Sequence, residues 1–360
     1  MKIGVIGCGY WGPNLIRNFI QSNKVQELSC CDLDPKRLDR MKKLYPSIHV
    51  FSDYKELLGL SDLDAVAIAT PVRTHHSIAR EFLLQGKHVL VEKPMTHSLE
   101  TALELVKLAE MNKRVLMVDH TFEYASAVNK IKTIVESAEL GEILYVSSIR
   151  VNLGLFQPDI NVVWDLAPHD ISIILYVLNK VPESVNCQGK AHYKASIEDV
   201  ATTSLNFENG VIAFIHNSWL DPNKIRKTTI VGSKKMLVYD DIETQEKIKI
   251  YDKGVEAPPY YDTFADFHFS YRYGDIYSPR IDDYEPLKKE CEHFLRCIGE
   301  EECPHTDGRD GMRVVAILEA ASKSLRLRGT EVSVQTWETE KNAAPRSIDH
   351  SALLTAEVNK

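Results

Sequence analysis

Near its start the chain reads KIGVIGCGYWG over residues 2–12, and this stretch decides the fold. The apolar run from Lys2 to Ile6 predicts a buried strand, and the apolar residues from Asn14 to Ile20 recur at helical spacing. Between strand and helix stand three glycines in the spacing G-x-G-x-x-G. In such a turn the amides at the start of the helix are free, so they form a binding site for a pyrophosphate.

Each glycine of this turn has a separate physical role. Gly7 makes the tight turn, Gly9 lets the backbone approach the pyrophosphate, and Gly12 lets the helix pack closely on the strand. A glycine triplet alone is a weak signal. It gains weight because a second apolar run ends in Asp32, twenty residues after Gly12, where a carboxylate accepts hydrogen bonds from the adenosine ribose. The alternative for Asp32 is a helix cap before Asp34.

The residue after Asp32 bears on the choice of cofactor. It is the apolar Leu33, whereas a site for a ribose 2′-phosphate usually carries an arginine or small hydroxyl residues. The Asp32 carboxylate would also repel that phosphate. We therefore expect NAD rather than NADP, although Lys36 and Arg37 follow on the next helix and leave acceptance of NADP open.

The pattern of strand and helix then repeats through the first third of the chain. Four further helices are expected: one over residues 35–44, a second directly after Asp53, a third that ends at Gln85 and a fourth over 99–111. Further strands are expected over 48–51, 65–69, 88–91 and 114–119. This alternation predicts an α/β fold with a doubly wound parallel sheet, in which ligands bind outside the carboxyl ends of the strands.

One of these strands ends in a lysine. The stretch KHVLVEKP, residues 87–94, has an apolar core that is followed by Glu92, Lys93 and Pro94. Pro94 stops the strand, so Lys93 is expected at the carboxyl edge of the sheet, where a cofactor and a substrate could meet. The alternative is an ordinary exposed lysine after a core strand.

The second half of the chain reads differently, with a helix near residues 128–135 and then a series of strands. These are expected over residues 143–151, 184–189, 200–207, 211–218, 228–231 and 236–240, and two helices follow over 286–298 and 309–327. Asn209 and Gly210 predict a hairpin turn. We expect a dinucleotide-binding domain over residues 1–121, an α+β domain with a mostly antiparallel sheet over 122–335, and a polar tail over 336–360.

Several motifs of the first half resemble a known family when they are read in order. They are Ala69-Thr70-Pro71, His75, Ile78-Ala79, Gly86-Lys87-His88-Val89 and Glu92-Lys93-Pro94. Together they resemble the family of glucose-fructose oxidoreductase, inositol dehydrogenase and rhizopine catabolism proteins (Gfo/Idh/MocA). The resemblance implies an N-terminal Rossmann domain, an open second sheet that pairs subunits into a homo-oligomer, either a dimer or a tetramer, and NAD-dependent oxidation of a CH-OH group. The cofactor would contact Gly7, Gly9, Tyr10, Trp11, Gly12, Asp32, Leu33, Thr70, Pro71, His75, Glu92 and Lys93.

The second domain contains a candidate for proton transfer. If a helix begins near Leu166, then Asp165 and His169 are four residues apart and share one face, so a carboxylate can orient an imidazole. Family members that oxidise ring hydroxyls resemble this arrangement. By that likeness His169 transfers the proton, Lys93 binds the reacting oxygen and Asp165 holds one or both in place. The alternative for His169 is a capping or core histidine.

Residues 150–165 suggest the substrate. This stretch resembles the family members that act on nucleotide-linked sugars, and most of all the UDP-N-acetylglucosamine 3-dehydrogenases. A pyrophosphate, hydroxyls and a ring would then meet Arg150, Asn152, Gln157, Asn161, Trp164 and Asp165. Residues 153–156 are alternatively a buried loop with polar edges. The other functions to weigh are an inositol, hexose or hexose-phosphate dehydrogenase, and a protein that binds dinucleotide and sugar without turnover.

Composition narrows the partners. The 360 residues carry 43 basic and 51 acidic side chains, a net charge of −8, and no basic stripe that would bind a nucleic acid. No apolar run is long enough for a membrane span, so we expect a cytoplasmic protein. The seven cysteines fit free thiols. Cys291, His293, Cys297, Cys303 and His305 cluster in sequence, but their spacing does not favour a metal site, and we expect none.

Overall fold

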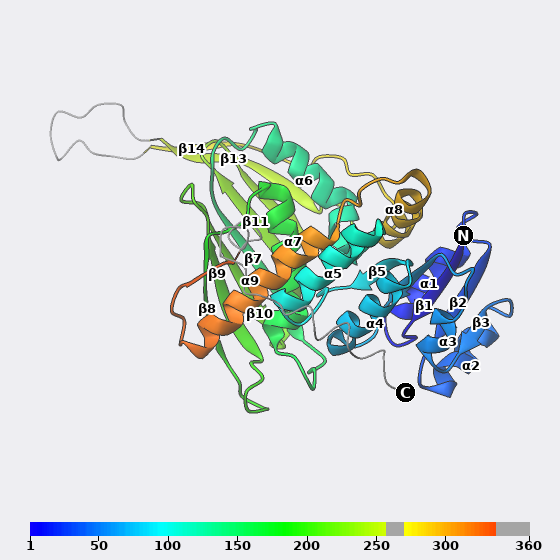
Figure 1. Ribbon diagram of the computed structural model, residues 1–360. Coiled ribbons are helices and arrows are strands. Elements are labelled where there is room, and N and C mark those ends of the chain that lie inside the picture. The colour runs from blue at the N-terminus through cyan, green and yellow to red at the C-terminus, as the bar shows by residue number, and fades with distance from the viewer. Residues whose placement is uncertain (257–269, 336–360) are drawn as a thin grey trace.

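The computed structural model describes residues 1–256 and 270–335, so the tail expected over 336–360 lies outside the described residues. Two sheets with helices around them lie side by side (Figure 1). The first sheet has six parallel strands in the order β3-β2-β1-β4-β5-β6. They are β1 (Lys2–Ile6), β2 (Glu27–Cys31), β3 (His49–Phe51), β4 (Ala65–Ile68), β5 (His88–Glu92) and β6 (Leu116–Asp119).

Five helices accompany this sheet. They are α1 (Gly12–Ile20), α2 (Pro35–Leu44), α3 (Tyr54–Leu58), α4 (Val72–Leu84) and α5 (Leu99–Asn112). Side chains at the helix starts fix several boundaries: Asp34 caps α2, Asp53 forms a capping box with Glu56, and Ser98 caps α5. Every residue of the central strand β4 is buried, as expected for a parallel sheet covered on both faces. The expected doubly wound parallel sheet is confirmed.

The second sheet has nine strands in the order β14-β13-β12-β11-β7-β10-β9-β8-β15. Only β7 and β10 pair in parallel among them; the other pairs are antiparallel. The strands are β7 (Ile143–Leu153), β8 (Ser184–Lys190), β9 (Val200–Asn206), β10 (Ile212–Ser218), β11 (Leu220–Gly232), β12 (Met236–Asp240), β13 (Ile248–Glu256), β14 (Ser270–Tyr277) and β15 (Val332–Ser333). The expected mostly antiparallel sheet is confirmed, but β13, β14, β15 and the first half of β11 were not predicted.

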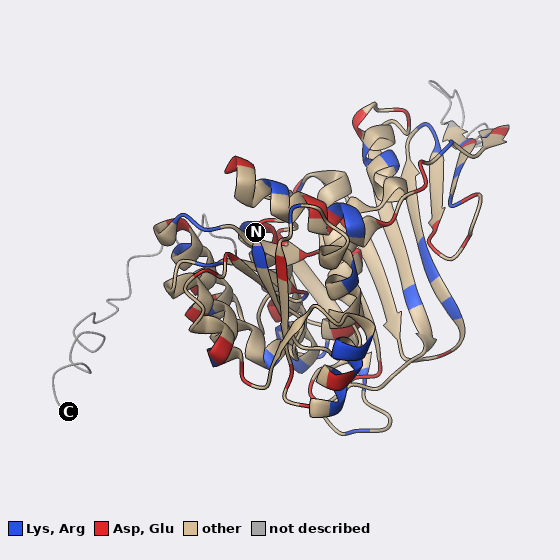
Figure 2. Cartoon of the chain, turned by 90° about the vertical axis from the view of Figure 1, so that its right-hand side faces the viewer, with Lys and Arg blue, Asp and Glu red and all other residues tan. Residues whose placement is uncertain are grey.

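Helices cover one face of this second sheet (Figure 2). The helical segments of this half are the short 3₁₀ helix η1 (Thr121–Tyr124), α6 (Ser126–Glu136), α7 (Val162–Leu178), α8 (Pro286–Glu300) and α9 (Gly308–Arg326). α7 packs on β7 and β10, and α9 lies between β8 and α5 of the first domain. α9 therefore joins the two halves, while the described residues leave the other face of the sheet open.

The sequence prediction assigned α8 to the second domain, and in the structure this helix contacts both halves of the chain. It packs against η1 and also against α1, where the rings of Phe19 and Phe294 lie 6.4 Å apart and Arg17 forms an ion pair with Glu285. The buried side chains of α8 belong to the same apolar cluster as β1 and α1. The C-terminal part of the chain therefore contributes side chains to the dinucleotide half.

Candidate active site

The glycine turn leaves no room for side chains at two of its three glycines. Gly7 has a φ of +96°, and a Cβ there would lie 2.4 Å from the carbonyl oxygen of Ala69. A Cβ on Gly12 would lie 1.8 Å from the carbonyl oxygen of Gly7. Both glycines are thus required by the close approach of β1, β4 and α1. The result is a bare backbone turn at a helix start, which fits the pyrophosphate of a dinucleotide.

Asp32 stands at the end of β2, beside this turn. Its carboxylate accepts hydrogen bonds from the amides of Cys8, at 2.7 Å, and Asp34, at 2.8 Å. It does not cap α2, because that role belongs to Asp34. Arg37 approaches the carboxylate of Asp32 to 3.4 Å, and the side chain of Leu33 is 89% exposed. A ribose at this position would meet one carboxylate and one guanidinium.

Trp11 connects the glycine turn to the first sheet. Its indole Nε1 donates a hydrogen bond of 2.6 Å to the Asp119 carboxylate at the end of β6. Tyr10, its neighbour, is 89% exposed. The polar atom of Trp11 is therefore engaged within the protein, while the Tyr10 ring is free to lie against a bound cofactor.

His75 lies beneath the loops that follow β4 and β5. It is buried, and its two ring nitrogens lie 2.7 Å from the carbonyl oxygen of Thr70 and 3.0 Å from that of Pro94. A neutral imidazole donates to only one of these oxygens. His75 thus holds the loop containing Thr70 and Pro71 against the loop of Lys93, and both of its ring nitrogens lie against backbone carbonyls. The sequence prediction had placed it in contact with the cofactor.

Two acidic residues near the ends of β5 and β6 have raised pKa values. Burial and the neighbouring Asp119 carboxylate raise the pKa of Glu92, and the same two causes raise the pKa of Glu290. Glu290 comes from α8 and is fully buried. Burial beside the Asp119 carboxylate therefore favours the protonated form of both groups. Glu290 was not predicted, because nothing in the sequence indicates that α8 returns to this edge of the first sheet.

Lys93 lies at the junction of the two halves, next to the start of α7. Its Nζ donates a hydrogen bond of 3.0 Å to the backbone carbonyl of Asp165. α7 begins at Val162, one turn earlier than expected, because Asn161 caps it by accepting a bond from the amide of Trp164. Lys93, Asp165 and His169 are thus brought together, as the motifs suggested, although the contact to Asp165 uses its carbonyl oxygen.

The carboxylate of Asp165 has a partner that the sequence did not indicate. Its Oδ2 accepts a hydrogen bond of 2.9 Å from the Nε1 of Trp219, which is buried. Within residues 1–256 and 270–335, no side-chain hydrogen bond joins Asp165 to His169. Phe156 lies 5.3 Å from the Trp219 ring and 5.6 Å from that of Tyr193, measured between ring centroids. Asp165 is therefore held from the side of this aromatic group.

His169 lies in a desolvated and positively charged environment. Burial, then the charges of Lys93 and Arg150, lower its pKa well below the usual range. Phe122 packs on it with 5.1 Å between ring centroids. Its Nδ1 is buried and has no hydrogen-bond partner among the described residues. The ring is consequently neutral at neutral pH, the form that accepts a proton.

Arg150 does not reach a position where it could bind a substrate pyrophosphate. Only 5% of its side chain is exposed, and its Nε and Nη2 donate to the Asp170 carboxylate at 3.0–3.1 Å. Ser148 donates to the same carboxylate at 3.0 Å. The geometry therefore does not support the expected role of Arg150. It forms a buried ion pair behind His169, with its guanidinium over the Phe122 ring.

The other expected substrate-binding residues fall into two groups. Asn161 caps α7 and donates to Glu198 at 2.7 Å, and Trp164 donates from its Nε1 to Ser322 at 2.7 Å, so their polar atoms are engaged. Asn152 and Gln157 are partly exposed. Asn152 lies beside Gly154 and Trp219, close to the aromatic group that holds Asp165. The structure thus leaves Asn152 and Gln157 available for a ligand.

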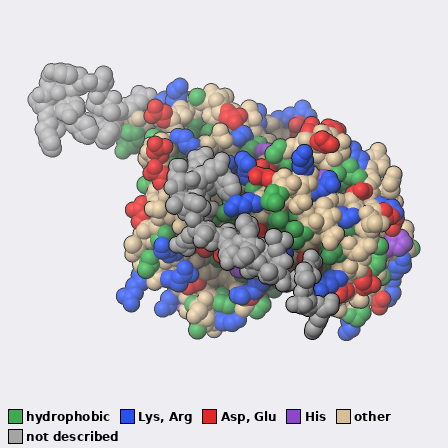
Figure 3. All heavy atoms as spheres, in the orientation of Figure 1, with side chains coloured by type: hydrophobic (Ala, Val, Ile, Leu, Met, Phe, Trp, Pro, Cys, Tyr) green, Lys and Arg blue, Asp and Glu red, His purple; other side chains and the backbone are tan. Residues whose placement is uncertain are grey.

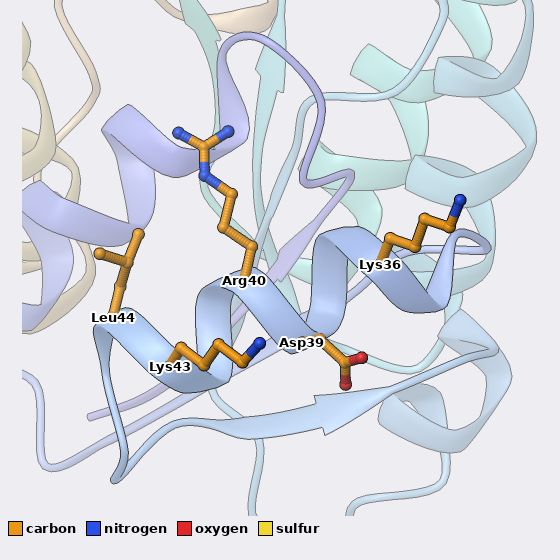
Figure 4. A pocket seen from close by; sticks show the side chains of 5 residues that line it. All are labelled: Lys36, Asp39, Arg40, Lys43 and Leu44. Carbon is orange, nitrogen blue, oxygen red and sulfur yellow. The ribbon is translucent and has the colours of Figure 1, made fainter.

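The α2 surface has a hollow of about 490 Å³, which is lined by Lys36, Asp39, Arg40, Lys43 and Leu44 (Figure 4). Its side chains come from one helix, and it lies away from α7 and β5 (Figure 1). On the face seen in Figure 3, basic and acidic side chains are interspersed. Among the described residues there is no cluster of three or more potential metal ligands. None of the described helices has the length and apolar character of a membrane span.

Comparison with known proteins matches both halves of the chain. Residues 1–120 match the model of an oxidoreductase family with an NAD-binding Rossmann fold, and residues 128–238 match the GFO/IDH/MocA C-terminal domain. UDP-N-acetylglucosamine 3-dehydrogenase from Acidithiobacillus ferrooxidans is 25% identical over 324 residues, covering 88% of this chain and 94% of that protein. Myo-inositol 2-dehydrogenase from Thermotoga maritima is 24% identical and covers 90% and 96%.

Solved structures show the same fold over nearly the whole chain. That of the Acidithiobacillus ferrooxidans enzyme, GnnA, gives a TM-score of 0.75 at 24% identity and covers 91% of this chain and 98% of its own. The WlbA dehydrogenase from Bordetella pertussis, in complex with NADH and UDP-GlcNAcA, gives 0.76 at 20% identity and covers 93% and 98%. These likenesses extend through both sheets.

Proposed function

Because the chain carries both domains of the Gfo/Idh/MocA oxidoreductase family, it belongs to that family, and we propose that it oxidises a nucleotide-linked sugar with NAD. The reacting group is a secondary ring hydroxyl, and the product is a keto sugar. We assign the reaction to the 3-hydroxyl of UDP-N-acetylglucosamine. The observation that carries the proposal is the approach of Lys93 to the start of α7, whose first two turns carry Asp165 and His169.

Different residues of the site assist the removal of the hydride and of the proton. Bound NAD supplies the hydride acceptor. His169 accepts the hydroxyl proton, since its low pKa keeps the imidazole neutral near pH 7. The ammonium of Lys93 has protons left after its bond to the Asp165 carbonyl, and it stabilises the negative charge that develops on the substrate oxygen. Trp219 positions Asp165, and Asp165 in turn positions Lys93.

The substrate class is supported by relatives and by the residues left available. GnnA acts on UDP-N-acetylglucosamine by its name, and WlbA was solved with a UDP-linked sugar acid. Asn152 and Gln157 can bond hydroxyl or acetamido groups, and Phe156, which is 42% exposed, offers an aromatic ring. A cyclic polyol is the second candidate, because myo-inositol 2-dehydrogenase is almost as similar in sequence.

A substrate panel tests this proposal. NADH formation is followed with UDP-N-acetylglucosamine, its uronate, dTDP-linked sugars, glucose 6-phosphate, glucose and myo-inositol, and NMR of the product locates the carbonyl. Turnover of free polyols with none on any nucleotide sugar would refute the substrate class. A carbonyl at C4 or C6 would refute the assigned position. No turnover on the whole panel would favour a protein that binds without reacting.

The open face of the second sheet suggests a homo-oligomer. On neighbouring strands β7 and β10, Tyr145 lies opposite Ile212, and Phe214 follows with 46% of its surface exposed. Such an apolar patch on a sheet face is typical of a subunit interface. We assign this face to pairing with a second copy of the chain. Light scattering should show a dimer or tetramer that Phe214→Glu dissociates, with Glu208→Gln on an exposed turn as the control.

A further inference from the structure

The ends of β5 and β6 present two pairs of polar residues to opposite sides of the first sheet. Glu92 lies opposite Asp119 in the last pair of the parallel register, and Lys93 and His120 directly follow these two strand ends. Successive side chains of a strand face opposite ways. Asp119 faces the glycine turn, where it accepts the bond from Trp11, and Lys93 reaches the other way to α7. His120 is therefore placed beside Lys93.

The surroundings of His120 agree with this placement. Apart from burial, the main influence on its ring is the charge of Lys93, and His120 is in turn among the groups that act on His169. All three side chains therefore belong to one small region between β5, β6 and α7. His120 was not among the predicted site residues, although its place directly after β6 could have indicated it.

His120 is buried without the hydrogen bonds that a buried imidazole needs. It is 1% exposed, and in the described part of the chain neither ring nitrogen has a hydrogen-bond partner. Burial and the charge of Lys93 lower its pKa to about 3, so the ring is neutral and offers one donor and one acceptor. Leaving such atoms unpaired in a protein interior is unfavourable.

Two structural histidines of the same chain show the contrast. His75 is equally buried, but both of its ring nitrogens lie within hydrogen-bond distance of backbone carbonyls. His88 accepts a bond of 3.0 Å from the amide of Val115. Both of these structural histidines therefore have hydrogen-bond partners in the protein backbone. Among the residues that the structure describes, His120 has no such partner for either ring nitrogen.

We propose that His120 binds a hydroxyl of the sugar ring next to the carbon that is oxidised, an inference that rests on the proposed function of this site. A hydroxyl group both donates and accepts, which matches the two free nitrogens of a neutral imidazole. Lys93 and His169 would hold the reacting oxygen, and His120 would fix the ring relative to it. Such a contact selects strongly against substrates that lack the hydroxyl.

The nicotinamide amide offers similar hydrogen-bonding chemistry, so the variants must separate the two ligands. His120→Phe keeps a ring of similar size without nitrogens, and His120→Asn restores one donor and one acceptor. With NAD saturating, we expect kcat/KM for UDP-N-acetylglucosamine to fall about 10- to 100-fold in the Phe variant and by less than about fivefold in the Asn variant. The Kd for NAD should change by less than about twofold. His49→Phe, on the exposed strand β3, is the control.

Two kinetic outcomes would overturn the proposal. Weaker NAD binding with unchanged sugar kinetics would assign the ring to the nicotinamide. Equal losses in the Phe and Asn variants would make His120 a structural residue whose shape alone matters.

A binding measurement tests His120 without turnover. Wild-type protein with isotope-labelled histidine is loaded with NADH and titrated with UDP-N-acetylglucosamine and, separately, with myo-inositol. The His120 ring signal, assigned by its loss in His120→Phe, should move with at least one sugar and stay unchanged with NADH alone. A signal unmoved by both sugars overturns the proposal. Turnover of myo-inositol and of no nucleotide sugar refutes only the proposed substrate. The role of His120 is then tested by whether its ring signal moves in the myo-inositol titration.

Discussion

The choice of cofactor depends on one carboxylate and the guanidinium beside it. Asp32 accepts two backbone amides and faces Arg37 at 3.4 Å, so in the wild-type protein the two side chains partly neutralise each other. NAD should bind more tightly than NADP, because a 2′-phosphate would meet the carboxylate. The perturbation is Asp32→Ala, which removes the acceptor for the ribose hydroxyls and frees Arg37.

The size of the effect follows from the bonds that are lost. A hydrogen bond to a charged group contributes about 1.5–3 kcal/mol, so the Kd for NAD should rise about 10- to 100-fold. The Kd for NADP should change less or fall, because the released Arg37 is then able to pair with the 2′-phosphate. The ratio of the two Kd values should therefore approach one.

Fluorescence titration of both cofactors measures this ratio, and Arg37→Met is the matched control. In the double variant that combines Asp32→Ala with Arg37→Met, any gain in NADP binding should vanish, while the Kd for NAD should stay near that of the Asp32→Ala variant. Thermal unfolding without cofactor separates these effects from loss of the turn, since Asp32 also holds the Cys8 amide. The reasoning fails if wild-type protein binds NADP as tightly as NAD, or if Asp32→Ala leaves their ratio unchanged.

Three further predictions concern the reacting centre. Lys93→Met and His169→Ala should each lower kcat by at least about a hundredfold with little change in NAD affinity, and near-normal turnover of His169→Ala in steady-state assays would mean that another group accepts the proton. Since the pKa of His169 is lowered, kcat should stay constant through neutral pH and fall only in acid, below the ordinary histidine pKa of about 6.5. Because the charge of Lys93 contributes to this lowering, NMR titration should show a higher pKa of His169 in the Lys93→Met variant. Arg150→Met should lower the free energy of unfolding by about 3–5 kcal/mol, because it strands the buried Asp170, whereas a raised KM with unchanged stability in denaturant titrations would restore a substrate-binding role.

The sequence predicted the parts of the fold that depend on local pattern. Most strands of the first sheet are rich in apolar residues and are separated by clear caps such as Asp34 and Asp53, so their places along the chain and the parallel sheet could be predicted. In β14 nearly every side chain is exposed and charged residues interrupt the apolar ones, so no strand signal stood out. The start of α7 was misplaced because the cap, Asn161, was taken for a substrate ligand.

In the candidate site too, the residues that stand in local sequence motifs could be predicted and those brought in by long-range packing could not. Lys93 and His169 were found because each stands in a recognisable local motif. Trp219 meets Asp165 across 54 residues of chain, and Glu290 arrives on a helix that packs against the first domain. Such contacts depend on how the two sheets dock, and no spacing in the sequence records it.

The alternation of side chains at the end of β5 explains how one short motif keeps a lysine charge available. Glu92 and Lys93 are neighbours in sequence, and an ionised Glu92 would weaken the field of the ammonium at the substrate oxygen. Glu92 lies beside Asp119 whereas Lys93 reaches α7, and burial together with the Asp119 carboxylate raises the pKa of Glu92 and so favours its neutral form. The charge that remains on Lys93 lowers the pKa of His169 and of His120, so both rings stay neutral. One uncompensated cation therefore both stabilises the developing alkoxide and keeps His169 ready to accept the proton.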